Sequence, residues 1–279
     1  MKYTGLALNG GGMRGVLQVG ALQALSEEMN EKFLHNIFTD GVYGISMGAL
    51  IATLIAFEFS VDDLSVLTEL LGNMQDAFQP LRLQALLGLT QTNGIDDGSK
   101  IYTLLDTEFK KRGLDFGNLR IGDAAIPLRI IASDLSSLKV AVFGQTIKVW
   151  DALRASFSIP YIFTPHTIEN KLFVDGAILC RRILDVVPQK DRENTMFLMT
   201  AQTKEITIDN YMSAVPFSRS IKDTYSVKDM YPLNTCLLIE NSAQMFTFWE
   251  SADIVRHLLS VGRTSYHEFR SEGLHEKLT

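Results

Sequence analysis

The stretch Gly44-Ile45-Ser46-Met47-Gly48 joins two strongly apolar segments, residues 37–43 and residues 49–57. The first segment predicts a buried strand and the second a helix, so the serine lies in a strand-to-helix turn. A G-x-S-x-G turn of this kind holds the serine hydroxyl exposed above a sheet, and glycines flank it because a Cβ there would crowd the neighbouring backbone. Ser46 is therefore the candidate nucleophile, and Gly44 and Gly48 are expected to support its turn.

Other serines lack this setting. Ser156 and Ser158, near Pro160, are not surrounded by a strand-to-helix turn. We interpret both as loop or helix-capping residues.

A second strand–turn–helix unit precedes the serine turn. Residues 3–8 form a short apolar stretch that ends at Asn9 and three glycines, after which apolar residues recur at helical spacing between Val16 and Met29. Two such units in succession predict an α/β fold with a parallel sheet.

The glycine-rich turn Gly10-Gly11-Gly12-Met13-Arg14-Gly15 supports two interpretations. It matches the G-x-G-x-x-G pattern of dinucleotide-binding turns, which also require an acidic residue about 20 positions later, at the end of the second strand. Glu31 has that spacing but precedes the predicted strand, and Asp40 lies inside it. Alternatively, the unhindered N–H groups of consecutive glycines can converge on an oxygen that becomes negative during acyl transfer, with Arg14 adding positive potential. The three adjacent glycines favour this oxyanion hole.

A serine nucleophile needs a base within hydrogen-bonding reach. None of the five histidines follows a late strand as a triad histidine would, and His166 is the reserve candidate. Asp175 instead ends the apolar segment 171–174 and is followed by Gly176 and Ala177, which allow a close turn. A carboxylate becomes a stronger base where burial disfavours its charge, so Asp175 is the candidate partner of Ser46. An Asp-Gly pair alone is more often only a turn.

The rest of the sequence predicts elements that complete one domain over residues 1–279. Strands are expected at residues 128–132, 140–143 and 196–200, a short helix at 150–155, and closing helices between 243 and 269. The leucine-rich stretch 81–89 is favoured as a buried helix, with a lipid-facing surface as the alternative. Residues 202–232 are polar and predict loops. The motif-bearing core is residues 3–177, and residues 178–279 supply closing strands, loops and helices.

Composition argues against several classes of function. With 46% apolar residues, the 279-residue chain can bury a large core, and its net charge of −6 is expected to provide no basic face for nucleic acid or for an anionic membrane. Cys180 and Cys236 lack the spacing of a zinc site and are expected to be buried thiols in a reducing compartment. The first eight residues do not resemble a signal peptide, and the longest apolar run, residues 49–57, is far shorter than the roughly 18–20 residues that span a bilayer. We expect a cytoplasmic or peripheral membrane protein.

Three motifs in this order, residues 10–15, 44–48 and 175–177, resemble those of the patatin-like phospholipase family. Ala132-Ser133-Asp134-Leu135 is similar to the family's A-T-D-L strand end, and residues 155–165 are similar to its A-S-x-x-x-P-x-x-F-x-P segment. The resemblance covers roughly residues 3–177. It implies a three-layer α/β/α fold with a mainly parallel central sheet.

The resemblance also implies chemistry. It makes Ser46 the nucleophile and Asp175 the general base of a Ser-Asp dyad, with the backbone of Gly10, Gly11 and Gly12 and the side chain of Arg14 forming the oxyanion hole. Supporting positions of the motifs are Gly15, Gly44, Gly48, Gly176 and Ala177.

The activity implied by the resemblance is hydrolysis of acyl esters in phospholipids or other lipids, with no metal or cofactor and with peripheral contact to a membrane or lipid aggregate. Three alternatives stay open. They are acyl transfer to an acceptor other than water, a non-catalytic interaction module and, least favoured, a dinucleotide-dependent oxidoreductase.

Overall fold

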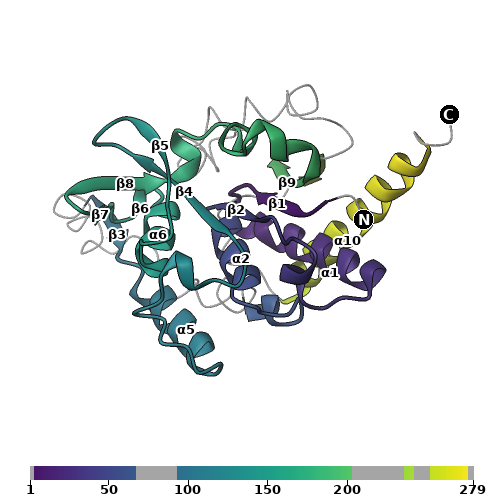
Figure 1. The fold of residues 1–279 in the computed structure, drawn as a ribbon, viewed down its shortest axis with the longest axis horizontal. Coiled ribbons are helices and arrows are strands. Elements are labelled where there is room, and N and C mark those ends of the chain that lie inside the picture. The colour runs from purple at the N-terminus through teal and green to yellow at the C-terminus, as the bar shows by residue number, and fades with distance from the viewer. Residues whose placement is uncertain (1–2, 67–92, 203–235, 242–251, 276–279) are drawn as a thin grey trace.

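In the part of the chain that the structure describes, a central sheet of eight strands organises the fold (Figure 1). The computed structural model describes residues 3–66, 93–202, 236–241 and 252–275. The leucine-rich stretch 81–89 and all but the first residue of the polar stretch 202–232 lie outside these residues. The parallel part of the sheet has the order β10-β9-β1-β2-β4, formed by β1 (Gly5–Leu8), β2 (Gly41–Ile45), β4 (Leu128–Asp134), β9 (Thr195–Gln202) and β10 (Cys236–Asn241).

Three antiparallel strands extend the sheet beyond β4. Both β5 (Lys139–Val142) and β8 (Lys171–Asp175) pair with β4, and β7 (His166–Ile168) pairs with β8. A separate small sheet joins β3 (Gly94–Asp96) to β6 (Tyr161–Phe163) in parallel. The predicted α/β class with a mainly parallel sheet is confirmed.

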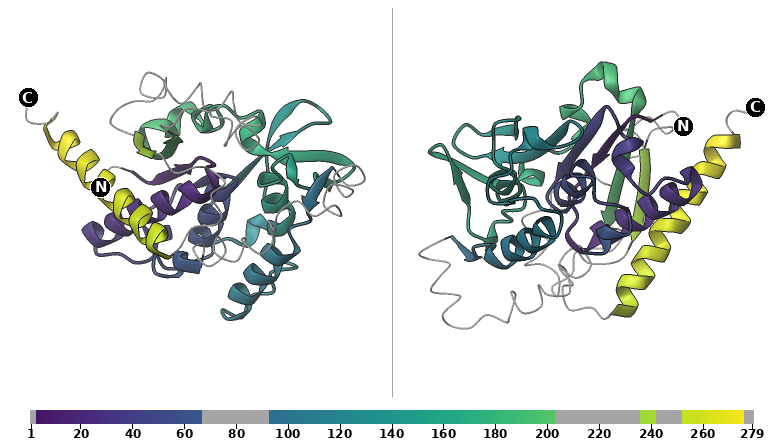
Figure 2. Two further views of the ribbon diagram at one scale, coloured as in Figure 1. Left: turned by 180° about the vertical axis from the view of Figure 1, so that it is seen from behind. Right: turned by 60° about the horizontal axis from the view of Figure 1, so that its bottom comes forward.

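Helices cover one face of the sheet. They are α1 (Gly15–Met29), α2 (Met47–Ala56) and α6 (Val149–Ser156), with α5 (Ser99–Lys110) further out. Every residue of α2 is buried, because this helix lies between the sheet and its neighbours. The long helix α10 (Ala252–His275) lies along α1, as both views of Figure 2 show, and Tyr266 on α10 donates a hydrogen bond to Glu28 on α1 over 2.8 Å.

The opposite face carries a second apolar cluster. Alternation along β1 sends Leu6 and Leu8 into the helical layer and Ala7 into this second cluster. Its cover includes the short 3-10 helices η5 (Gly176–Ile178) and η6 (Ile183–Val186), and a further 3-10 helix, η7 (Gln189–Asn194), precedes β9. Because both faces are covered, the inner strands are buried on both sides, as parallel strands usually are.

Most predicted elements occur, with shifted boundaries. The strand expected at residues 37–43 begins only at Gly41, whose φ of +113° ends the preceding turn. The remaining 3-10 helices are η1 (Gly12–Arg14), η2 (Leu34–Asn36), η3 (Asp63–Ser65) and η4 (Ile121–Asp123). Among the described residues, no helix is long and apolar enough to cross a membrane.

Candidate active site

Ser46 occupies the predicted turn between β2 and α2. Its backbone has φ 54° and ψ −120°, a conformation that few residues other than glycine adopt, and its side chain is largely buried. Strain of this kind persists only where the surroundings enforce it, and it is frequent at functional sites. Gly48 is required on steric grounds, since a Cβ there would lie 2.5 Å from the carbonyl oxygen of Leu8.

Asp175 lies at the end of β8, immediately beyond the end of β2. Consecutive residues of β4, Ile131 and Ala132, pair with Ile45 and Asp175 respectively. The two strand ends abut, because a Cβ on Gly176 would lie 3.1 Å from the Cγ2 atom of Ile45. The sheet register therefore brings together two residues that are far apart in the sequence, Ser46 and Asp175.

The Asp175 carboxylate is almost fully buried, with 1% of its surface exposed. One oxygen, Oδ1, accepts a hydrogen bond of 2.9 Å from the backbone N–H of Ala177. Burial raises the pKa of Asp175 to about 6, although hydrogen bonding by the Ser46 hydroxyl and the Ala177 amide opposes the rise. The other oxygen, Oδ2, is buried and accepts no hydrogen bond of normal geometry from the described residues, although the Ser46 hydroxyl lies close enough to the carboxylate to lower its pKa. Asp175 thus has an unused acceptor and a pKa suited to a base near neutral pH.

The glycine-rich turn lies against Ser46 and Met47. A Cβ on Gly10 would lie 3.1 Å from the Cβ of Ser46, and a Cβ on Gly15 would lie 2.2 Å from the Cγ of Met47. Within the described part of the chain, the N–H groups of Gly10 and Gly11 donate to no other residue. Free N–H groups beside a serine hydroxyl are what an oxyanion hole requires.

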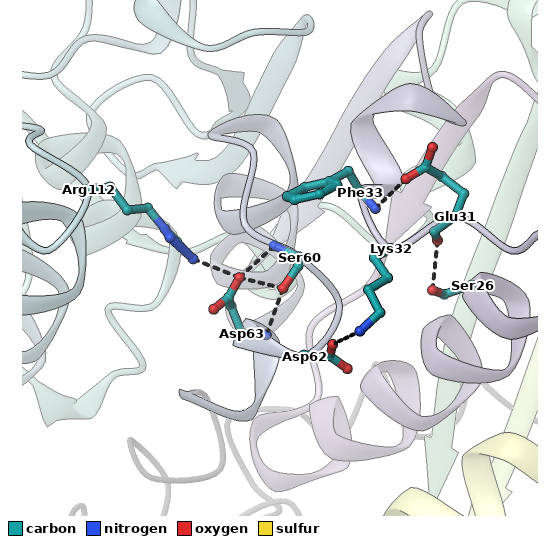
Figure 3. Close-up of polar contacts among 8 residues, drawn as sticks. All are labelled: Ser26, Glu31, Lys32, Phe33, Ser60, Asp62, Asp63 and Arg112. Atoms are coloured by element: carbon teal, nitrogen blue, oxygen red, sulfur yellow. Dashed lines mark hydrogen bonds and ion pairs between the residues drawn. The ribbon is translucent and has the colours of Figure 1, made fainter.

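The surroundings of this turn do not match the dinucleotide interpretation. Asp40, one acidic candidate for a ribose contact, accepts a hydrogen bond of 2.5 Å from the hydroxyl of Thr4. Thr4 and Asp40 precede β1 and β2, at the amino ends of these strands, whereas the glycine turn follows the carboxyl end of β1. The other candidate, Glu31, accepts a hydrogen bond of 2.8 Å from the N–H of Phe33, also before β2 (Figure 3).

Arg14 is a buried cation within the turn. Its guanidinium donates from Nε to the carbonyl oxygen of Gly11 over 3.4 Å, and 4% of the residue's surface is exposed. Burial lowers the pKa of Arg14 to about 10, so the side chain stays charged at neutral pH. No carboxylate among the described residues forms an ion pair with it. The turn therefore carries a positive charge without a carboxylate partner in that part of the chain.

Ser156 is a site residue that our sequence interpretation missed. It ends α6 and is fully buried, and its hydroxyl oxygen accepts a 2.8 Å hydrogen bond from the backbone N–H of Ser46. The same hydroxyl donates to the carbonyl oxygen of Ile131 over 2.6 Å. Interpreting Ser156 as a loop or capping residue was wrong, because it ends α6 and its hydrogen-bond partners are Ser46, in the turn after β2, and Ile131 on β4, both distant in the sequence.

The neighbouring Ser158 supports the other candidate catalytic residue. Its carbonyl oxygen accepts a hydrogen bond of 2.9 Å from the backbone N–H of Asp175. Its hydroxyl donates to the carbonyl oxygen of Arg154 over 2.6 Å. The A-S-x-x-x-P resemblance at residues 155–165 was the signal that could have identified this support.

Ser133 and Asn9 are two further supports that the sequence did not reveal. The Ser133 hydroxyl donates to the carbonyl oxygen of Asp175 over 2.8 Å and accepts from the N–H of Leu179 over 3.0 Å. Asn9 pairs with the peptide group of Thr200, accepting at 2.9 Å and donating at 3.0 Å. These bonds fix the aspartate turn and the glycine turn to β4 and β9.

The reserve base and the two cysteines lie in other settings. His166 on β7 has its Nε2 atom 3.0 Å from an Oδ1 atom of Asp151 on α6, so its partner is a carboxylate and not Ser46. Cys180 is buried and Cys236 is partly buried, both are free thiols, and burial raises the pKa of each to about 12. No group of three or more acidic, histidine or cysteine side chains among the described residues is arranged to hold a metal ion.

The sequence matches the model of the patatin-like phospholipase family over residues 6–187. The chain therefore belongs to this family.

Two relatives illustrate the sequence match, and one solved structure illustrates the likeness of fold. The Bacillus subtilis protein YqhO is 28% identical over 197 residues, which cover 63% of this chain and 64% of YqhO. Calcium-independent phospholipase A2-gamma from Rattus norvegicus is 26% identical over 197 residues, which cover 62% of this chain and 24% of the phospholipase. The match thus spans less than two thirds of either relative. The crystal structure of VipD from Legionella pneumophila superposes with a TM-score of 0.60 and 15% identity, covering 98% of this chain and 67% of VipD, and it shows likeness of fold.

Proposed function

We propose that the chain is a lipid acyl hydrolase of the phospholipase A or lysophospholipase type that works through a Ser46–Asp175 dyad. The observation that carries the proposal is the meeting of a strained serine at the end of β2 with a buried carboxylate of pKa about 6 at the end of β8. Membership of the patatin-like phospholipase family supports a lipid ester as the substrate.

Acylation begins with the Ser46 hydroxyl. Asp175 accepts the hydroxyl proton on Oδ2 while Oγ attacks the acyl carbon of the ester, and the carbonyl electron pair moves onto its oxygen. The N–H groups of Gly10, Gly11 and Gly12, together with the Arg14 cation, stabilise this oxyanion. When the tetrahedral intermediate collapses, the bond to the leaving alcohol breaks, and Asp175 returns the proton to that alcohol.

Deacylation repeats the same steps with water. Asp175 accepts a proton from a water molecule, whose oxygen attacks the acyl carbon bound to Ser46. The second oxyanion is stabilised by the same groups. Collapse releases the fatty acid, and the proton on Asp175 returns to Oγ of Ser46. Each residue ends the cycle as it began.

The test compares Ser46→Ala and Asp175→Asn with the unmodified chain on a soluble short-chain ester and on phospholipid. The matched control is Ser26→Ala, because Ser26 is also a buried serine whose hydroxyl donates to a carbonyl oxygen, that of Glu31 at 2.7 Å (Figure 3). We expect both dyad variants to lose at least about a hundredfold in kcat, and the control to keep its activity. Undiminished turnover by either dyad variant contradicts the proposal.

Labelling by a fluorophosphonate provides an independent measurement. The unmodified chain and Ser26→Ala are expected to be labelled on Ser46, and Ser46→Ala is not. Mass spectrometry of the labelled peptide identifies the residue. A label on another serine would refute the assignment of the nucleophile.

A further inference from the structure

The turn between β4 and β5 lies beyond the carboxyl end of β2, where Ser46 is located. Because β4 runs parallel to β2 and pairs Ile131 with Ile45, the three remaining residues of β4 continue past the nucleophile. At about 3.3 Å per residue, Asp134 lies roughly 10 Å further along this direction. Residues 135–138 form the turn itself, and β8 begins beside it at Lys171.

Two leucines are exposed at this turn. Leu138 is 74% exposed and has φ 54°, and Leu172 is 39% exposed. The N–H of Leu135 donates to the carbonyl oxygen of Leu172 over 2.8 Å, which places Leu172 beside the end of β4. Leu138 directly precedes β5, which also pairs with the end of β4. Glycine or asparagine adopts a positive φ more readily than leucine does, and exposing Leu138 to water gives no stability. Folding alone does not account for leucine at this position.

The turn is held in one conformation by Asp134. Its carboxylate accepts hydrogen bonds from the N–H groups of Ser136 and Ser137, at 2.8 and 3.1 Å, and from the Ser137 hydroxyl at 2.8 Å. The hydroxyl of Ser136 in turn accepts from the N–H of Leu172 at 2.9 Å. Leu138 is therefore presented by an ordered turn, so little conformational entropy is lost when it is buried by a partner.

Positive charge accompanies the leucines. Lys139 directly follows Leu138, and Lys171 directly precedes Leu172. Both lysines are exposed, and neither forms an ion pair within the described part of the chain. Two acidic side chains lie near these lysines: Asp134, which is paired opposite Lys139 in the β4–β5 ladder, attracts Lys171 and accepts hydrogen bonds from its own turn, and Glu169 in the β7–β8 turn. Exposed leucines next to lysines suit an anionic lipid surface, because leucine side chains can contact acyl chains while lysine ammonium groups contact the phosphates of the head groups.

We propose that Leu138 and Leu172, with Lys139 and Lys171, form an interfacial tip that inserts into anionic phospholipid surfaces and brings lipid to Ser46. The inference rests on the proposed function, since it assigns the lipid-contacting surface of that same site. The leucines enter the boundary between head groups and acyl chains, and the lysines contact phosphates. The strand ends that carry Ser46 and Asp175 then face the lipid.

The experiment measures binding separately from catalysis. Co-sedimentation uses the full chain carrying Ser46→Ala, with vesicles of phosphatidylcholine containing phosphatidylglycerol and with vesicles of phosphatidylcholine alone. Leu138→Asn is the test variant, because asparagine tolerates a positive φ and the fold is preserved. We expect it to bind anionic vesicles roughly tenfold more weakly, as expected for loss of one partly buried leucine. Lys139→Gln with Lys171→Gln should abolish the preference for anionic vesicles.

The matched control is Phe33→Asn. Phe33, labelled in Figure 3, is also an exposed apolar residue, at 43%, but it precedes β2 and so lies toward the amino ends of the strands, away from Ser46. Its substitution should leave vesicle binding unchanged. An equal loss in Phe33→Asn and Leu138→Asn, or absence of vesicle binding by the starting protein, overturns the proposal.

Activity distinguishes failure of this inference from failure of the proposed function. With Ser46 present, Leu138→Asn should keep its kcat/KM on a soluble ester and lose about tenfold on vesicles. If Ser46→Ala still hydrolyses the soluble ester, the Ser46–Asp175 dyad is refuted. The comparison of vesicle binding between Leu138→Asn and Phe33→Asn still tests the interfacial tip, because it does not depend on catalysis. An equal loss of Leu138→Asn on both substrates overturns the role of the tip.

Discussion

Asp175→Asn should make the protein more stable and less active. Burial raises the pKa of Asp175 from 3.8 to about 6. The folded state therefore holds the carboxyl proton more tightly than the unfolded chain does. The cost of this residue to folding grows as pH rises from about 4 to about 6, and it stays constant at higher pH. At 1.36 kcal/mol per pKa unit, the ionised carboxylate costs about 3 kcal/mol at neutral pH.

Asparagine removes the charge and keeps the shape. Its carbonyl oxygen can still accept from the N–H of Ala177, and its NH2 group takes the place of the buried Oδ2. We expect Asp175→Asn to raise the free energy of unfolding by up to about 3 kcal/mol at about pH 8. The gain should shrink as pH falls through about 6 and vanish near about pH 4, while kcat falls by about 10²–10⁴.

Urea unfolding followed by circular dichroism, at several pH values between about 4 and 8, measures this difference. Both proteins are compared at each pH, so that titration of other groups cancels. A stability difference that does not change with pH would refute the raised pKa of Asp175. Retained turnover on a soluble ester would refute its role as the base.

Three further predictions concern the same site. First, kcat/KM of the unmodified protein on a soluble ester should rise with pH and level off above about 6, since the base accepts a proton only when ionised; a profile that is flat down to about pH 4 would contradict this. Second, Ser156→Ala leaves the buried N–H of Ser46 without its acceptor, so we expect about 1–3 kcal/mol lower stability and a lower kcat with KM and the pH inflection unchanged. The same loss of kcat in Ser26→Ala would show that the effect is not specific to this serine. Third, Gly48→Ala places a methyl group 2.5 Å from the Leu8 carbonyl oxygen and should cost about 1–3 kcal/mol, measured as a lower Tm. Gly144→Ala, where nothing lies within 4 Å of the added Cβ, should leave Tm nearly unchanged.

The two candidate catalytic residues were predictable because each is identified by its immediate neighbours. Ser46 lies between an apolar strand and an apolar helix, and Asp175 ends an apolar strand before a glycine. Such patterns are local, so they can be recognised without knowledge of the tertiary fold. What the sequence did not reveal is that β8 runs antiparallel to β4, and this direction is what brings Asp175 to the end of β2.

The supports of the site were not predictable in the same way. Ser156, Ser133 and Asn9 act through hydrogen bonds to backbone groups that lie 110, 42 and 191 residues away along the chain. A serine or an asparagine at the end of a helix or strand has many local uses, and only the packed fold selects among them. Very short strands such as β3 and β6 were missed because three residues are too few to show alternation.

The direction of β8 has a consequence for how the protein can diversify. Asp175 lies at one end of this strand, and the β7–β8 turn at residues 169–170 lies at the other. Insertions at the β7–β8 turn would lengthen the end of the sheet far from Asp175 without altering the spacing between Ser46 and Asp175. The β7–β8 turn is therefore a natural place to insert a new loop, since neither Ser46 nor Asp175 has to move to accommodate it.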